Sequence, residues 1–161
     1  MSQNNTYNAN TKSSDPNPQI SYPLEGQWST GLYDCWDDPS TCLIASCFPC
    51  ITMGRIVEMI DKGSTSCFVG GLIYCALNPK CFGKLYAYSY RSKLRALFSL
   101  PEAQYSDAFV SSCCCVCALT QEYRELKNRG FDPSIGWEAN VEKWKREGVT
   151  MPPSVAPGMA R

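Results

Sequence analysis

The chain has 161 residues, 44% of them apolar, with 15 basic and 15 acidic residues and no histidine. The balanced charge gives no electrostatic reason to expect a nucleic-acid partner, and the lack of histidine excludes histidine-based general-base or triad catalysis. The 11 cysteines are an odd number, and residues 1–20 lack the apolar core of a secretory signal. We therefore expect reduced thiols, metal ligands or buried cysteines rather than a secreted disulfide scaffold.

Both ends of the chain are poor in the residues that build a core. Residues 1–27 are rich in Asn, Ser, Thr and Pro, and residues 149–161 contain three prolines and a glycine. Such segments bury too little apolar surface to offset the entropy cost of ordering. The sequence predicts two disordered tails around one structured domain, residues 28–148.

Two dipeptides mark helix starts in this domain. Asp38-Pro39 and Asp132-Pro133 each place a capping residue before a proline, which is typical of the first helical position. From Pro39 onward the chain carries no charge before Arg55, so a single helix is predicted to extend to Ile60, before Lys62-Gly63.

Three uncharged segments have the composition of apolar helices: residues 39–54, 63–79 and 108–121. Each is shorter than the roughly 20 residues that a spanning helix needs. Three interpretations stay open: core helices of a soluble protein, short tilted helices that thin the bilayer, or broken helices shielded by neighbouring subunits. Gly70-Gly71 in the second segment would allow two helices to approach closely.

A basic segment follows the second apolar segment. It has no acidic residue between positions 80 and 100, and its basic residues alternate with tyrosines: Lys80, Lys84, Arg91, Lys93 and Arg95. This pattern is typical of a cytosolic membrane interface, and a solvated helix face is the alternative.

The last part of the domain has ordinary helical patterns. Residues 121–130 are strong helix formers closed by Gly130. Trp137, Val141 and Trp144 recur at helical spacing, and we interpret them as one packing stripe of a short amphipathic helix.

The cysteines carry the chemistry of this chain, since soft thiolates suit cadmium, zinc or copper(I). The candidate metal ligands lie in and before the first apolar segment: Cys42, Cys47, Cys50, Cys35, Asp37 and Asp38. For the first three, the roles of transient transport ligand, structural metal ligand and inert core thiol all stay open.

A second thiol cluster comprises Cys113, Cys114, Cys115 and Cys117. These residues cannot all share one helix face, so some of them pack or carry palmitate. The spacing of Cys47-Phe48-Pro49-Cys50 is also that of a thiol–disulfide redox site, but the strand that such a site needs is not evident. We expect the protein not to be an enzyme.

Three stretches together resemble a known family. They are Trp28-Ser29-Thr30-Gly31-Leu32, the segment from Cys42-Leu43 through Pro49-Cys50 to Gly54, and residues 117–132. In this order they resemble the plant cadmium-resistance proteins, which belong with the fruit-weight and cell-number-regulator proteins in one cysteine-rich family. The resemblance implies a small plasma-membrane protein linked to cadmium or zinc transport and tolerance, to organ size, or to both. The family motif usually has Cys-Pro-Cys where this chain has Phe48-Pro49-Cys50, so the metal site that the resemblance implies is altered here.

The sequence thus predicts a mainly α, cysteine-rich, membrane-associated domain with short hydrophobic segments. We expect a homo-oligomer in the lipid bilayer whose protomers shield broken helices and line a path for cadmium or zinc ions. Heavy-metal transport or tolerance is the expected function. The alternatives are a non-transporting membrane regulator of cell number and a cytosolic thiol buffer for metals.

Overall fold

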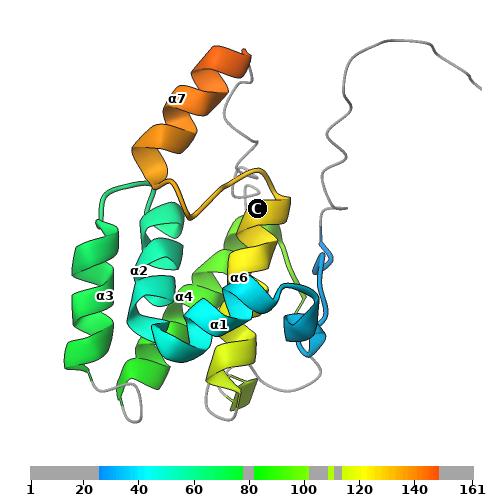
Figure 1. Ribbon diagram of the computed structural model, residues 1–161, viewed down its shortest axis with the longest axis vertical. Helices are drawn as coiled ribbons and strands as arrows, with labels where there is room; N and C mark the ends of the chain where they lie inside the picture. Colours follow the sequence, from blue (N-terminus) through cyan, green and yellow to red (C-terminus); the bar gives the residue numbers. More distant parts are fainter. Residues whose placement is uncertain (1–25, 78–81, 102–108, 111–113, 149–161) are drawn as a thin grey trace, which may run out of the picture.

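The computed structural model describes residues 26–77, 82–101, 109–110 and 114–148, which form a bundle of α-helices without strands (Figure 1). Its elements in chain order are η1 (Asp34–Asp37), α1 (Pro39–Cys47), α2 (Pro49–Ile60), α3 (Cys67–Ala76), α4 (Gly83–Phe98), α6 (Cys115–Asn128) and α7 (Trp137–Glu147). The predicted mainly α fold is confirmed. The predicted tails lie almost entirely outside the described residues: residues 1–25 of the first and all of the second, residues 149–161.

The apolar segment after Asp38 forms two helices instead of the single one that the sequence predicts. The start is as expected, because Asp38 caps α1 by accepting from the Thr41 backbone N at 3.1 Å. The break is at Phe48, whose backbone is not helical (φ −133°, ψ 61°). Pro49 causes this break, since a proline disfavours a helical conformation in the preceding residue. As a result, the chain bends by 109° between α1 and α2.

Helices α2 and α3 lie side by side in the bundle (Figure 1). The two helices approach so closely that a side chain at either Gly54 or Gly70 would meet the opposite helix. A Cβ on Gly54 would lie 2.1 Å from the carbonyl oxygen of Cys67, and one on Gly70 would lie 3.0 Å from the Cβ of Val57. The glycines therefore serve the close helix approach that Gly70-Gly71 predicts.

Helix α6 brings polar groups into the core. The guanidinium of Arg91, from α4, donates to Glu122 at 3.1 Å and to Gln121 at 2.8 Å, and it stacks over the Trp28 ring at 4.5 Å. The Arg91 side chain is fully buried in this arrangement. Its predicted position at a membrane interface is therefore wrong, because the carboxylate and the aromatic ring hold it inside the bundle.

A turn precedes α7, so the predicted helix start at Asp132-Pro133 is wrong. Asp132 instead accepts from the backbone N of Ser134 at 2.9 Å, and α7 begins at Trp137. The side chain of Trp144 packs edge-on against Phe131, with ring centroids 5.3 Å apart. The rings of Trp137 and Trp144 also contact each other at 5.7 Å, which confirms the predicted packing stripe.

Candidate functional site

The cysteines of the first apolar segment are dispersed by the bend between α1 and α2. Cys47 is exposed at the end of α1, and Cys50 is half-buried at the start of α2. Cys42 lies one turn into α1 and contacts Cys35 instead. Within the described residues, no group of three or more Cys, Asp or Glu side chains is placed so as to hold a metal ion. Cys42, Cys47 and Cys50 therefore do not form a common site.

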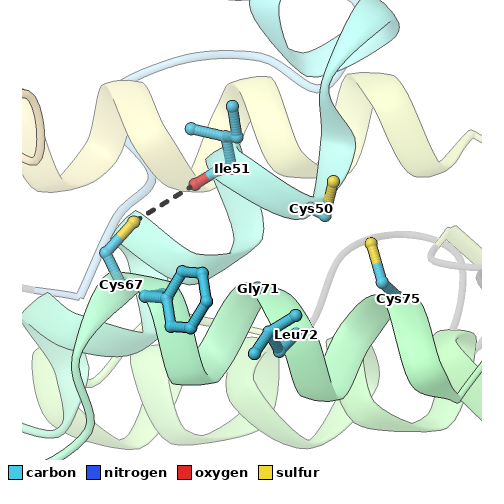
Figure 2. A pocket seen from close by; sticks show the side chains of 7 residues that line it. Cys50, Ile51, Cys67, Gly71, Leu72 and Cys75 are labelled. Carbon is cyan, nitrogen blue, oxygen red and sulfur yellow. Dashed lines mark hydrogen bonds between the residues drawn. The ribbon is translucent and has the colours of Figure 1, made fainter.

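A pocket of about 410 Å³ lies between α2 and α3. It is lined by apolar groups and three thiols: Cys50, Ile51, Cys67, Phe68, Gly71, Leu72 and Cys75. Figure 2 shows the sulfur of Cys75, on α3, directed toward α2 beside Cys50, and these two thiols interact. The thiol of Cys67 donates to the carbonyl oxygen of Ile51 at 3.9 Å. This thiol pocket is the most concentrated group of soft ligands on α2 and α3.

Two of the three pocket cysteines were not among the residues that the sequence singled out. Cys67 and Cys75 are eight residues apart, a spacing that places both on one stripe of a helix. This periodicity could have paired the two cysteines on one face. It could not have shown that Cys50 faces them, because that depends on the bend at Phe48.

The surface around the thiol pocket is apolar. Phe68 of α3 is 73% exposed, and neither α1 nor α3 contains a charged residue. The other exposed large hydrophobic side chains from α1 to α4 are Leu43, Ile44, Phe48, Ile51, Val69, Leu72, Ile73, Phe82, Leu85 and Tyr88. Across the described ranges no one helix has both the length and the apolar character to cross a membrane, and only the bent α1–α2 pair passes such a test jointly. Soluble monomers seldom expose so many large apolar side chains together.

A second group of thiols lies at the start of α6. The thiol of Cys117 donates to the sulfur of Cys35, from η1, at 3.9 Å. Cys115 points elsewhere, because its sulfur is 3.2 Å from the hydroxyl of Tyr74 on α3. Cys114 is half-buried just before α6, and Cys113 lies outside the described residues. The second cluster is therefore divided among different neighbours, as its spacing predicts.

The thiols of α6 are protonated at neutral pH. Burial raises the pKa of Cys117 to about 11, and the hydrogen bond with Cys35 and the nearby thiols add to this effect. Burial is also the main reason that the pKa of Cys115 is raised. A metal ion that binds to either group must therefore displace a proton.

The acidic residues predicted as oxygen ligands have partners within the chain. Asp38 accepts from the Thr41 hydroxyl at 2.7 Å, and this hydrogen bond lowers the pKa of the Asp38 carboxyl. Asp37 is exposed, and its carboxylate lies 3.7 Å from the guanidinium of Arg124. Neither carboxylate is part of a group of three or more Cys, Asp or Glu side chains that could hold a metal ion within the described residues.

The basic segment also makes contacts within the bundle. Lys93 lies 3.4 Å from Asp61 and over the ring of Tyr90 at 4.1 Å. Arg95 donates to the carbonyl oxygen of Leu100 at 3.5 Å, and Lys84 is half-buried. Lys80 lies outside the described residues. Whether the exposed part of this segment meets a membrane stays a prediction.

Comparisons with known proteins identify relatives of the whole domain. The model of the PLAC8 family matches residues 28–125. The chain is 51% identical over 138 residues to the Arabidopsis thaliana protein PLANT CADMIUM RESISTANCE 9, covering 85% of this chain and 91% of that protein. It is 49% identical over 137 residues to PLANT CADMIUM RESISTANCE 12 of the same plant, covering 85% and 84%. It is also 48% identical over 144 residues to Cell number regulator 1 of Zea mays, covering 84% and 74%. No solved structure matches.

Proposed function

The chain belongs to the PLAC8 family, and from this membership and its thiol pocket we propose that it acts in heavy-metal resistance, binding cadmium or zinc through cysteine thiolates at the plasma membrane. Two of its relatives are named for cadmium resistance. The observation that carries the proposal is the thiol pocket, because three thiols line an exposed apolar surface and two of them, Cys50 and Cys75, interact. Soft sulfur ligands favour cadmium, zinc and copper(I) over hard cations.

The exposed apolar side chains support a position at the membrane. Phe68 and Leu72 are 73% and 52% exposed, and both line the pocket. Each such side chain gains about 1.5–3 kcal/mol when it leaves water. The lipid bilayer is the partner that would cover this surface, since α3 offers no charge to hold it in water.

The form of the pocket suits an ion that is bound and released. A structural zinc site has four ligands in a closed shell, whereas the pocket brings only Cys50 and Cys75 together, with Cys67 about two turns away along α3. In a homo-oligomer the groove of one protomer would meet another apolar surface, and the thiols would then line a path between protomers. Transport of cadmium or zinc along this path is the mechanism that we propose for resistance.

Flux into liposomes tests this proposal. Purified full-length protein in liposomes is expected to admit cadmium or zinc to a metal-sensitive dye inside. The variant Cys50→Ser/Cys67→Ser/Cys75→Ser should lose this flux, because a hydroxyl is a poor ligand for soft metals. The matched control is Cys47→Ser, which changes an exposed thiol outside the pocket and should keep the flux.

A regulator of cell number is the second candidate, and the 48% identity to Cell number regulator 1 favours it. Such a regulator would act as a membrane scaffold without moving ions. Wild-type protein that is inserted and folded but gives no flux would support this candidate over the transporter. Complementation of a cadmium-sensitive yeast by the wild type, with loss in the triple variant at equal abundance, would support the transporter.

A further inference from the structure

Cys35 and Cys117 are 82 residues apart in the sequence and meet in the fold, with their sulfur atoms 3.9 Å apart. Two sulfurs that bind one zinc ion at about 2.3 Å in a tetrahedral shell lie about 3.8 Å from each other. A disulfide would instead require a sulfur–sulfur distance of about 2.05 Å. The observed separation is that of a thiol–thiol hydrogen bond, and it is also short enough for both sulfurs to bind one ion without a large movement.

The elements that carry these thiols are held together by other contacts. Arg124 of α6 donates to the carbonyl oxygen of Asp34 and lies 3.7 Å from the carboxylate of Asp37. These contacts fix η1 against α6 independently of the thiols. Cys42 of α1 also interacts with Cys35, so a third thiol lies beside the pair. Cys35, Cys42 and Cys117 are all partly exposed, which leaves a way in for an ion and for water ligands.

We propose that Cys35 and Cys117 form a two-thiolate binding site for a soft divalent cation of the zinc and cadmium class, with Cys42 as the neighbouring thiol. Water completes the coordination shell. The site is separate from the thiol pocket of α2 and α3, and it joins the first cysteine-rich segment to the second. When filled, it clamps η1 to α6. Only the choice of ion rests on the proposed function, because the site itself follows from the sulfur geometry.

A metal ion suits this pair better than a disulfide does. A disulfide requires the two sulfurs, which lie 3.9 Å apart, to close to about 2.05 Å, whereas a shared cation can bind them near their present positions. The charge of the cation stabilises both groups as thiolates. Binding releases one proton for each thiol that becomes a ligand.

Alkylation of the wild-type full-length chain tests the site without any substitution. The reduced protein in detergent is treated with N-ethylmaleimide, with and without cadmium chloride, and mass spectrometry follows each cysteine. We expect cadmium to slow the alkylation of Cys35 and Cys117 about tenfold, since a bound thiolate is no longer a free nucleophile. Cys47 is exposed at the end of α1 and serves as the internal control, whose rate should not change. Equal rates at Cys35 and Cys117 with and without cadmium would overturn the proposal.

Substitutions then count the ions. Cys35→Ser and Cys117→Ser should each lower the cadmium retained in equilibrium dialysis by about one ion per chain, because one thiolate alone holds a soft divalent ion weakly. Cys47→Ser should retain the wild-type amount, and equal retention in all three variants would refute the site. Neither measurement uses flux. If the wild-type protein gives no flux but cadmium still slows the alkylation of Cys35 and Cys117, the result counts against the transporter alone. If the protein gives flux but cadmium does not slow their alkylation, the result counts against this site alone.

Discussion

Arg91 and Glu122 form an ion pair of 3.1 Å between α4 and α6, and both side chains are fully buried. The pair is part of a larger network, because Gln121 accepts from Arg91 and donates to the carbonyl oxygen of Thr30. One guanidinium thus links α4, α6 and the segment that enters the bundle before η1. Buried charges persist in a core only when they are paired and hydrogen-bonded in this way.

Removing one partner of this pair should strongly destabilise the fold. We expect Arg91→Met to lower the free energy of unfolding by about 3–5 kcal/mol, because it removes the guanidinium that pairs with the buried Glu122 carboxylate. Urea denaturation of the purified protein measures this change. The double variant Arg91→Met/Glu122→Met should recover part of the loss. The free energy of unfolding of the exposed control Arg146→Met should stay within about 0.5 kcal/mol of the wild type. If Arg91→Met and Arg146→Met lost the same stability, the role of the buried pair would be contradicted.

The contact of α2 with α3 depends on Gly54. A Cβ at this position would lie 2.1 Å from the carbonyl oxygen of Cys67, which is backbone and cannot rotate away. Gly54→Ala should therefore separate the two helices and cost about 1–3 kcal/mol, even though alanine favours a helix. Thermal unfolding measures the loss. Ser46→Ala, at an exposed position of α1, is the control, and an unchanged melting temperature for Gly54→Ala would refute the close approach.

The sequence predicts best where the cause is local. Asp38 caps α1 and Gly130 follows the end of α6 with a φ of 85°, as their residue types lead one to expect. Proline chemistry also explains the break at Phe48, although the uncharged pattern alone suggests one continuous helix. The turn at Asp132 differs because its carboxylate binds Ser134, two residues on, instead of capping a helix.

Contacts between distant residues could not be read from the pattern. Arg91 has the same local setting as its basic neighbours, and only the position of Glu122 on another helix decides that it is buried. In the same way, the 3.9 Å approach of Cys117 to Cys35 depends on how α6 packs against η1. The candidate ligands were thus identified by residue type, while their grouping into sites required the fold.

Asp61 should make the stability sensitive to acid. Burial opposes its ionisation, but hydrogen bonds from Tyr90 at 2.7 Å and Thr65 at 2.9 Å, together with Lys93, lower the pKa of the Asp61 carboxyl below its usual value. A lowered pKa in the folded state adds stability at pH values above the unfolded pKa of 3.8, and this gain is lost as the pH falls through the folded value.

We therefore expect Asp61→Asn to lower the melting temperature at about pH 7 and to lower it less at about pH 2, because the gain is lost as the wild-type carboxyl takes up its proton. Thermal unfolding at the two pH values measures the difference. Glu147→Gln, on the exposed end of α7, should show no such dependence. A loss of the same size at both pH values would mean that the carboxylate charge contributes nothing.

The exposed side chains of α3 give the most direct test of membrane binding. Phe68 and Leu72 lie one turn apart on α3, and both line the thiol pocket. Phe68→Asp and Leu72→Asp should each weaken the binding of the protein to lipid vesicles about tenfold or more, because each removes 1.5–3 kcal/mol of apolar transfer energy and adds a charge, by a rough estimate. Vesicle flotation measures the bound fraction.

The matched control for this test is Ile135→Asp, which places the same charge at an exposed apolar side chain in the turn before α7. If the surface of α3 meets the lipid, this variant should float with the vesicles as the wild type does. If all three variants float as well as the wild type does, α3 does not contact the bilayer. If all three lose vesicle binding to the same extent, binding responds to overall charge. Only a loss confined to Phe68→Asp and Leu72→Asp places the thiol pocket at the membrane, where a transported ion would have to pass.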